Sequence, residues 1–276
     1  MSVPLLKEPA IGTNNNCDLT LEFTKPACAS SQLAGGKGTQ LALLTQLDGK
    51  FMVPRGFCLT VAAYRRHLNE NKHLRDSIVE LENIAYKRKG GDIHEISKAT
   101  VESFNNTQLT PELERAVLKQ LSELFGEEWN EKTFAVRSSA VGEDGGEASF
   151  AGQMESFLGV IGIKEICNCI AKCWASSFTQ QAIEYRRNHG QIVAADVGVC
   201  IQEMVEADVA GVLFTRDPVT GNPGIMTINV SYGIGEAVVS GVTEPDTIYL
   251  QRSFNDKLIV KKKILGSKKI KMVISV

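Results

Sequence analysis

Apolar positions follow a helical period in some stretches of the chain and a strand period in others, which predicts a mixed α+β fold. From Ala62 to about Phe104 the pattern is mainly helical and charged, with a break at Gly90-Gly91. A further helix is predicted to begin at Thr110-Pro111, with threonine as its N-cap and proline in its first turn. Its buried stripe is expected to comprise Leu113, Val117, Leu121, Leu124 and Phe125.

Strand-like segments surround a glycine-rich loop in the middle of the chain. Residues 133–136 are typical of a strand, residues 142–146 of a loop, and residues 149–160 of a second strand or hairpin arm. A helix is predicted over residues 163–188. In the tail, lysines alternate with apolar residues, which favours strands with one solvated face over a basic binding patch. Between this helix and the tail, strands are expected in VGVCIQEMV, AGVLFT, TINVS and TIYLQR.

The length of 276 residues suits one large domain or two lobes that share a cleft. We expect a loose N-terminal arm over residues 1–19, because this opening is polar and rich in asparagine. A first lobe is expected over residues 20–195 and a second over residues 196–276, where the last β-rich stretch follows the helical pattern.

Charge and hydropathy limit the possible partners. Thirty basic residues stand against 32 acidic ones, giving a net charge of −2, whereas a nucleic-acid binder needs excess Lys and Arg to neutralise phosphates. No window holds about 18 consecutive apolar residues, and the first residues lack the pattern of a secretory signal. We therefore expect a cytoplasmic protein with no nucleic-acid partner and no membrane segment.

The seven cysteines are expected to be reduced thiols in such a compartment. Cys167, Cys169 and Cys173 form a cluster that invites comparison with a metal site. Their spacing lacks a CxxC pair, no histidine lies nearby and the segment has a helical pattern. Buried thiols are therefore favoured over a metal site.

The first candidate site is the turn Gly35-Gly36-Lys37-Gly38, which precedes the apolar-periodic run 40–47. Glycines let backbone N–H groups approach phosphates closely, a helix N-terminus adds a positive dipole end, and Lys37 would add a cation. The segment is not a P-loop, because Lys37 is followed by glycine. On its own, the segment is better explained as a tight turn with a solvated lysine.

The second candidate site is AVRSSAVGEDGGEASFAGQMESF. Arg137 ends an apolar strand, where a rigidly held guanidinium can bind phosphate oxygens with two hydrogen bonds. The glycines and serines that follow could form a lid over a nucleotide. The alternative is an exposed hairpin in which Arg137 pairs with Glu143 or Asp144. The lid candidates are Gly142, Gly145, Gly146, Ser149, Gly152 and Ser156.

Two weaker candidates lie further along the chain. In VCIQEMV, alternation places Gln202 on the face opposite Ile201, and its amide suits the edge of adenine, with Met204 and Val205 as possible lining. A plain sheet strand explains the same pattern. In SYGIGE, Glu236 could help to hold Mg²⁺, but a role in capping the following helix is favoured.

Taken together, five segments in order resemble one family of proteins. They are GGKGTQLALLTQL, VPRGFCLT, FAVRSSAVGEDGGEASFAGQMESFLGV, IQEMVEADVAGVLFTRDPVTGNP and NVSYGIGEAVVSGVTEPDTIYL. The family comprises phosphoenolpyruvate synthase, pyruvate phosphate dikinase and rifampicin phosphotransferase, and the resemblance is to its nucleotide-binding domain. It implies an ATP-grasp fold, in which two lobes hold ATP and Mg²⁺ between them.

The resemblance also implies roles for single residues. Lys37 and Arg137 would contact phosphates, and Gly152 and Ser156 match the segment that covers them, although threonine is usual where Ser156 stands. Gln202 matches the position that faces adenine. Family enzymes pass a phosphoryl or pyrophosphoryl group to a histidine on a mobile carrier domain and then to a small acceptor, such as pyruvate or an antibiotic hydroxyl.

This sequence departs from the family pattern near its end. A metal-binding glutamate, a Gln-Ser-Arg-Pro motif and the histidine carrier do not occur before Val276, so the resemblance implies a second lobe that is cut short. An ATP-dependent phosphotransferase module is the leading hypothesis. An ATP-binding pseudoenzyme or regulatory fragment without phosphotransfer is the alternative, and a carboxylate ligase on the same fold is disfavoured.

Overall fold

The computed structural model describes residues 18–142, 154–253, 255 and 257–274, which form two compact units. The first unit is Met1–Glu203 and the second is Met204–Val276. Helices and sheets occur together, which confirms the α+β class. The second lobe was expected to begin at residue 196, but the strand at that point pairs with strands of the first unit. Sequence periodicity carries no information on pairing partners, so it could not assign this strand.

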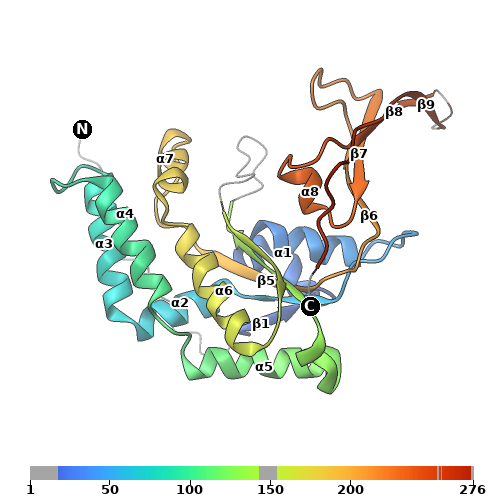
Figure 1. Ribbon diagram of the computed structural model, residues 1–276. Coiled ribbons are helices and arrows are strands. Elements are labelled where there is room, and N and C mark those ends of the chain that lie inside the picture. Colours follow the sequence, from blue (N-terminus) through green and yellow to red (C-terminus); the bar gives the residue numbers. More distant parts are fainter. Residues whose placement is uncertain (1–17, 143–153, 254, 256, 275–276) are drawn as a thin grey trace. The chain divides into compact units, whose positions relative to one another are not determined.

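The first unit is built on a five-stranded antiparallel sheet (Figure 1). Its strand order is β1-β2-β5-β3-β4. Asp18 and Leu19, at the end of the expected loose arm, accept hydrogen bonds from Thr60 through their carbonyl oxygens. The chain is therefore fixed to the sheet just before β1. The strands are β1 (Thr20–Glu22), β2 (Gly56–Leu59), β3 (Phe134–Ala140), β4 (Ser156–Val160) and β5 (Val197–Glu203).

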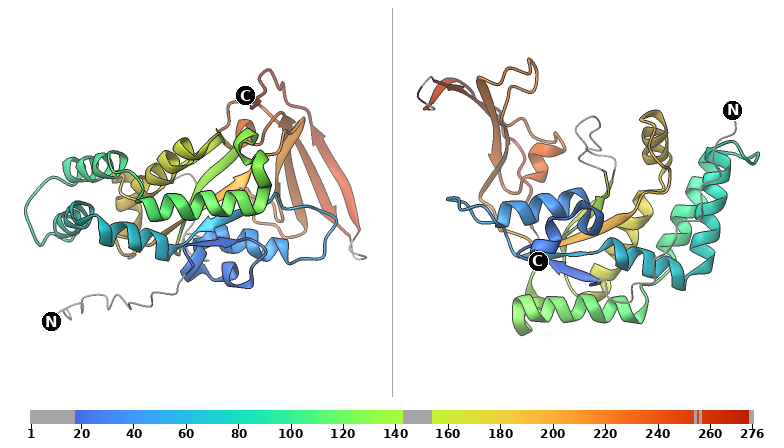
Figure 2. Two further views of the ribbon diagram at one scale, coloured as in Figure 1. Left: turned by 90° about the horizontal axis from the view of Figure 1, so that it is seen from below. Right: turned by 180° about the vertical axis from the view of Figure 1, so that it is seen from behind.

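One face of this sheet carries the main hydrophobic core. Phe57, Ile201 and Val136 lie directly opposite one another on β2, β5 and β3 and are fully buried. Figures 1 and 2 show helices α5 and α6 crossing this side of the sheet, and Trp174 of α6 is also fully buried. The helices around this core are α2 (Val61–Glu70), α3 (Lys72–Ala85), α4 (Ile93–Asn105), α5 (Pro111–Phe125), α6 (Ile163–Ser176) and α7 (Gln180–Asn188).

The predicted helices are confirmed in outline, with two corrections. The break at Gly90-Gly91 falls between α3 and α4, as expected. Thr110 is the N-cap residue of α5, but its hydroxyl makes no capping hydrogen bond, so proline in the first turn begins this helix without that help. The single helix predicted over residues 163–188 is wrong. It is divided into α6 and α7 because the hydroxyl of Thr179 accepts a hydrogen bond from the Ala182 N–H and starts a new helix.

The opposite face of the sheet is covered by α1 (Ser31–Thr45) and the short 3₁₀ helix η1 (Pro26–Ala29). Its smaller core contains Leu21, Phe23, Cys28, Ala34, Ala42, Cys58 and Cys200. Apart from Leu21 and Phe23 these side chains are small, which lets the backbone of α1 approach the strands closely. A second 3₁₀ helix, η2 (Gly126–Glu131), follows α5.

The second unit contains a four-stranded antiparallel meander. Its strands are β6 (Val209–Phe214), β7 (Ile225–Tyr232), β8 (Asp246–Arg252) and β9 (Leu258–Ile264), with the short helix α8 (Glu236–Val239) between β7 and β8. The strands expected from AGVLFT, TINVS and TIYLQR are therefore present. All seven residues of β9 are exposed, the apolar ones included, so the prediction of one solvated and one buried face is wrong for this strand.

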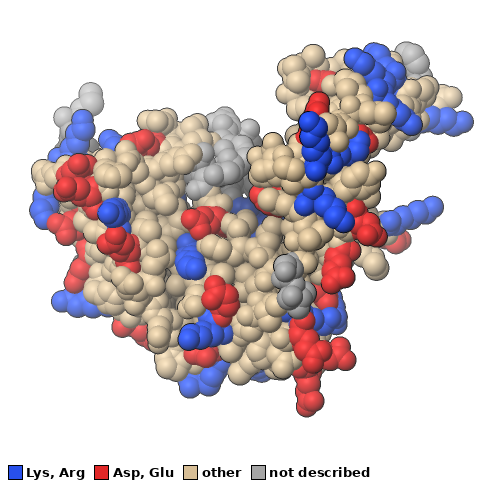
Figure 3. Space-filling model, in the orientation of Figure 1, with Lys and Arg blue, Asp and Glu red and all other residues tan. Residues whose placement is uncertain are grey.

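Among the residues that the structure describes, no helix combines the length and apolarity needed to cross a bilayer. Figure 3 shows acidic and basic side chains intermixed over the visible face of the first unit. This mixing agrees with the nearly balanced charge of the chain.

The glycine-rich turn lies inside α1 rather than before it. Gly35 has φ 70° and ψ −176°, a backbone conformation outside the helix, so α1 is kinked there and a new helical turn begins at Gly36. This conformation is accessible essentially to glycine alone. A Cβ atom on Gly35 would also lie 1.8 Å from the carbonyl oxygen of Ser139 in β3. The turn therefore requires glycine both for its dihedral angles and for its contact with the sheet.

We expect Gly35→Ala to lower the free energy of unfolding by about 3 to 5 kcal/mol, from backbone strain and from the clash with a rigid strand. Gly126→Ala is the matched control, because Gly126 has φ 67° and ψ −152° but no atom within 4 Å of the position that a Cβ would take. Urea unfolding should show a loss for Gly35→Ala at least about 2 kcal/mol larger than for the control. Equal losses would contradict the close approach of α1 to β3.

A buried histidine in the main core makes the stability of the first unit depend on pH. His67 of α2 is fully buried, and its ring centroid lies 4.9 Å from that of Trp174. Burial lowers its pKa from 6.5 to about 4. Below pH 6.5 the unfolded chain gains a proton that the folded chain does not accept until about pH 4, so stability is lost as the pH falls through this window.

At pH 5 this effect amounts to about 2 kcal/mol relative to pH 7. We expect His67→Phe to remove most of that pH dependence, because phenylalanine keeps a ring beside Trp174 and carries no proton. Urea unfolding followed by tryptophan fluorescence at the two pH values measures the difference. His94→Gln, at an exposed position on α4, should leave the pH dependence unchanged. If the free energy of unfolding of His67→Phe changes between the two pH values as much as that of the wild type, the assignment to His67 is refuted.

Candidate functional site

The glycine-rich turn is fixed to strand β3 by the hydroxyl group of Ser139. Ser139 Oγ accepts a hydrogen bond from the Gly38 N–H at 3.0 Å and donates one to the Ala34 carbonyl oxygen at 2.6 Å. On the other side of the kink, Thr39 Oγ1 donates to the Gly35 carbonyl oxygen at 2.7 Å. One hydroxyl thus joins the two halves of α1 to the strand that carries Arg137, and it holds the N-terminal turn of the second half in place.

Strand register places Arg137 on the face of the sheet that α1 covers. Arg137 in β3 is directly opposite Cys200 in β5 and Ser156 in β4. Cys200 is in turn opposite Cys58 in β2. Directly opposed residues of antiparallel strands point to the same side of a sheet, so these four side chains form a row across the α1 face. Ser156 is exposed and Arg137 is partly buried.

Lys37 and Arg137 both act electrostatically on the same buried thiol. The pKa of Cys200 is lowered from its ordinary value, first by a hydrogen bond with Cys58 and also by one with Ser139. Burial opposes this change, whereas the charges of Arg137 and Lys37 add to it. Two cations a hundred positions apart in the sequence are therefore close enough to influence one sulfur atom. Their shared role in binding phosphate stays a prediction, and both charges favour negative charge near Cys200 on the α1 face of the sheet.

Gln202 also lies on the α1 face, two residues beyond Cys200 in β5. Its side chain is 9% exposed, and its Nε2 donates a hydrogen bond to the Pro54 carbonyl oxygen at 3.1 Å. Gly56 of β2 lies opposite, and a Cβ there would be 2.9 Å from the Cα of Gln202. One of the two N–H donors of the amide is therefore used in this bond. Val205, a predicted lining residue, is 57% exposed.

Several other predicted site residues lie outside the described part of the chain or in the second unit. Gly145, Gly146, Ser149 and Gly152 lie outside the described residues. Glu236 is the first residue of α8 in the second unit, where an acidic side chain suits the positive end of the helix. The N-cap itself is Gly235, so Glu236 stabilises the helix end from inside the first turn rather than as the cap.

The predicted cysteine cluster behaves as a set of buried thiols. Burial raises the pKa of Cys167 and of Cys169 to about 12. Within the described part of the chain, no group of three or more His, Cys, Asp or Glu side chains is placed to hold a metal ion. The structure therefore identifies no donor set for a resident metal among these residues.

Sequence reasoning missed the serine and the two thiols that support the cations. Ser139 follows Arg137 by two positions in AVRSSA, so strand periodicity alone would have put both on one face. Cys58 and Cys200 offered no such signal, because each belongs to an apolar strand and their pairing depends on the order of strands in the sheet. That order cannot be read from either segment alone.

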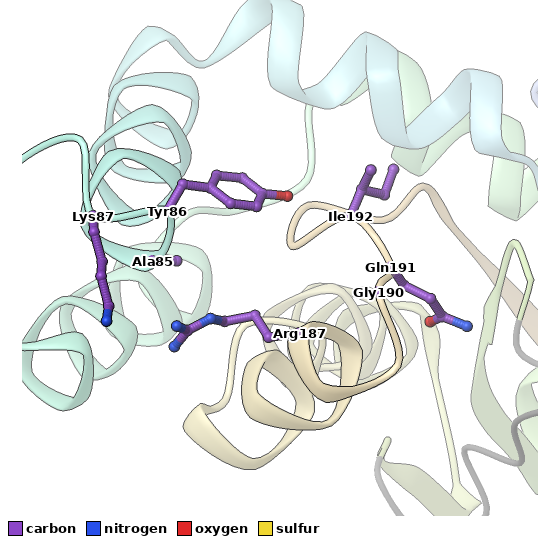
Figure 4. Close-up of a pocket in the computed structure, with 7 residues that line it drawn as sticks. All are labelled: Ala85, Tyr86, Lys87, Arg187, Gly190, Gln191 and Ile192. Atoms are coloured by element: carbon purple, nitrogen blue, oxygen red, sulfur yellow. The ribbon is translucent and has the colours of Figure 1, made fainter. Parts of the chain in front are cut away.

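A hollow elsewhere on the first unit contains none of the predicted site residues. It has a volume of about 400 Å³ and lies between the end of α3 and the end of α7 (Figure 4). Its two basic side chains, Lys87 and Arg187, follow or close a helix, where cations balance the negative end of the dipole. They therefore have a structural explanation. The lining comprises Ala85, Tyr86, Lys87, Arg187, Gly190, Gln191 and Ile192.

Comparison with known proteins finds relatives over most of the chain. It is 36% identical to a rifampicin phosphotransferase from Bacillus subtilis over 240 residues, covering 86% of this chain and 26% of that protein. It is 38% identical to a rifampicin phosphotransferase from Streptomyces sviceus over 220 residues, covering 78% and 24%. It is 33% identical to a phosphoenolpyruvate synthase from Pyrococcus furiosus over 276 residues, covering 84% and 33%.

The chain thus spans between about a quarter and a third of the length of these curated relatives. A family model described as "Pyruvate phosphate dikinase, AMP/ATP-binding domain" matches residues 31–276. The matched segment contains both cations, the serine that fixes the turn, most of the first unit and all of the second. On this match, the chain belongs to the pyruvate phosphate dikinase AMP/ATP-binding domain family.

Proposed function

We propose that this chain is the ATP-binding part of an ATP-dependent phosphotransferase with an ATP-grasp site. The observation that carries the proposal is the pair of hydrogen bonds by which Ser139, two residues after Arg137 in β3, holds Ala34 and Gly38 on either side of Lys37 in the turn of α1. Two cations and a helix N-terminus at one place form a site for a polyphosphate. The family supports ATP as the nucleotide, and we place the reaction in the cytoplasm, where ATP is made.

In this proposal each side chain has a separate task. Lys37 and Arg137 neutralise the phosphates and balance the charge that spreads over the transferred group, which is the main source of acceleration in phosphoryl transfer. The N–H groups at the kink in α1 point toward the phosphates, and Gly152 and Ser156 cover them. Gln202, held through Pro54, presents its amide oxygen to the amino group of adenine. The substrate is MgATP, in which phosphate oxygens supply most of the metal ligands, and Glu236 is a candidate for one more.

The phosphoryl acceptor is proposed to be a histidine on a carrier domain, which then delivers the group to a small molecule. Relatives of this chain include a rifampicin phosphotransferase and a phosphoenolpyruvate synthase. In this proposal, the same type of nucleotide domain therefore serves different acceptors in different proteins. We infer that the acceptor is chosen outside the ATP-binding segment. The carrier and acceptor domains are accordingly partners of this chain, in a longer polypeptide or in another subunit.

ATP binding is tested by thermal unfolding with and without nucleotide. A ligand present at a hundred times its Kd stabilises the folded state by about 2.7 kcal/mol, or roughly 5 to 10 °C in Tm for a domain of this size. We expect Lys37→Met and Arg137→Met each to abolish the shift with MgATP. Lys98→Met and Arg115→Met remove the same charges at exposed positions on α4 and α5 and should keep it.

Inorganic tripolyphosphate separates the two parts of the proposed site in the same assay. It should stabilise the wild type, fail with the Lys37 and Arg137 variants, and still act on Gln202→Leu. That last variant should lose only the additional shift that ATP gives over tripolyphosphate. If Lys37→Met and Arg137→Met both show the wild-type shift of Tm with MgATP, the assignment of the phosphate site is wrong.

Phosphotransfer is tested with ATP labelled in its β- or γ-phosphate and a separately supplied histidine-bearing carrier domain. We expect label on the carrier histidine with the wild-type chain and a loss of at least about a hundredfold in rate with Lys37→Met, because the cation acts on the transition state. A carrier in which the histidine is replaced by alanine is the control. Binding without transfer to a functional carrier would leave the chain as a nucleotide-binding protein only.

A further inference from the structure

Three buried thiols lie directly beneath the glycine-rich turn of α1. Cys28, Cys58 and Cys200 all have 0% exposed surface. Cys58 Sγ lies 3.8 Å from the Ala34 carbonyl oxygen, and Cys28 Sγ lies 3.9 Å from that of Gly38. A Cβ atom on Gly38 would lie 2.3 Å from Cys58 Sγ, so the backbone of α1 packs against this sulfur too closely for any side chain larger than that of glycine.

Cys58 and Cys200 are placed to bond to each other. They face each other across β2 and β5, and their sulfur atoms are 3.2 Å apart. Directly opposed residues of antiparallel strands have Cα separations of about 4.5 to 5.5 Å. This interval lies inside the range of about 4.4 to 6.8 Å found for disulfides. Closing the bond to about 2.05 Å therefore needs movement of the side chains and little movement of the strands.

The two thiols differ in chemical character. The pKa of Cys58 is raised well above its ordinary value, mainly by its hydrogen bond to Cys200, then by one with Cys28 and by burial. The pKa of Cys200 is lowered, by the hydrogen bond with Cys58 and by Ser139, Arg137 and Lys37. Because the thiolate is the nucleophile in thiol oxidation, Cys200 is the thiol that attacks and Cys58 is the one that resolves.

We propose that Cys58 and Cys200 form a reversible oxidative modification site that closes to a disulfide when a hydroperoxide reaches the α1 face. Cys200 sulfur attacks one peroxide oxygen, the O–O bond breaks, and with hydrogen peroxide the products are a sulfenic acid at Cys200 and one water. Cys58 sulfur then attacks the Cys200 sulfur, the S–O bond breaks, and a second water leaves with the Cys58 proton. Two thiols lose two electrons and two protons, and the peroxide becomes two waters.

The disulfide would act on the turn above it. Closing the bond removes the Cys58 proton and draws the Cys58 sulfur toward Cys200, so the support beneath Ala34 and Gly38 changes. Lys37 lies next to Gly38, and its position follows that of the turn. We infer that oxidation weakens phosphate binding and that a bound polyphosphate, by neutralising Lys37 and Arg137, slows oxidation of Cys200. This second inference rests on the proposed function, whereas disulfide formation itself does not.

The site is tested on the whole wild-type chain by treatment with hydrogen peroxide, blocking of free thiols with an alkylating agent, and peptide mapping without reduction. The expected result is one linked pair of peptides that contains Cys58 and Cys200, with loss of two alkylatable thiols and full recovery after dithiothreitol. The partly buried Cys167 of α6 is the internal reference and should stay alkylatable at peroxide doses that close the pair.

Three results would overturn the assignment: a Cys28–Cys58 link, stable oxyacids on Cys200 without a link, or oxidation of Cys167 before the pair. Cys200→Ala should lose the link, and Cys28→Ala should keep it. Repeating the wild-type reaction with saturating MgATP should lower the rate of closure several-fold. An unchanged rate, with the disulfide still formed, overturns only the coupling to phosphate binding; if ATP also fails to shift Tm, the proposed function has failed separately.

Discussion

The hydrogen bonds of the Ser139 hydroxyl are the constraint on which the candidate site depends. At Gly35 the backbone leaves the helical conformation, so the carbonyl of Ala34 and the N–H of Gly38 lie on opposite sides of an interrupted helix. Both would be buried, and a buried polar group without a partner costs about 1 to 3 kcal/mol. Ser139 satisfies both groups at once. Ser139 stands two residues after Arg137 in the same strand. The hydrogen bonds that stabilise the kink in α1 therefore also fix the position of the kink relative to the strand that carries Arg137.

The two faces of the first sheet carry different kinds of side chain: one face forms the main hydrophobic core, and the other carries the candidate site. Large apolar side chains such as Phe57, Ile201 and Trp174 fill the face covered by α5 and α6. The α1 face carries glycine, alanine and cysteine instead, and this choice of small residues lets a helix backbone lie close to the strands. Along β3 the alternation is direct, since Phe134 and Val136 enter the main core while Arg137 and Ser139 point to α1. The functional face can therefore be polar without weakening the core.

The sequence predicts the elements of this fold better than their arrangement. The helices on either side of Gly90-Gly91, the proline start of α5 and the strands of the second unit follow from periodicity and turn residues, which are local properties. The division between α6 and α7 was missed because a single hydroxyl, that of Thr179, decides it. The membership of β5 in the first sheet was missed because pairing is a contact between distant segments.

The same distinction holds for the candidate site. Lys37, Arg137 and Gln202 were chosen for the chemistry of their side chains and for their place beside glycines or in a strand. The structure adds that all three belong to the first unit, with Arg137 and Gln202 on the α1 face and Lys37 on α1 itself. Ser139, Cys58 and Cys200 escaped notice because their importance comes from what they touch. A serine in a strand or a cysteine in an apolar segment has no local signature of that kind.

The charges of Lys37 and Arg137 connect the two proposals, nucleotide binding and thiol oxidation. Both cations favour negative charge on the α1 face of the sheet, where the two proposed anions are a triphosphate and the Cys200 thiolate. They differ in solvation, because the thiol is fully buried whereas Ser156, on the same row of the sheet, is exposed. In the proposed site, a polyphosphate that reaches this row from the solvent would carry more charge than one thiolate and would lose less hydration than a fully buried group. On that proposal it would gain more from the two cations than the thiolate does, which would favour the protonated thiol pair while nucleotide is bound.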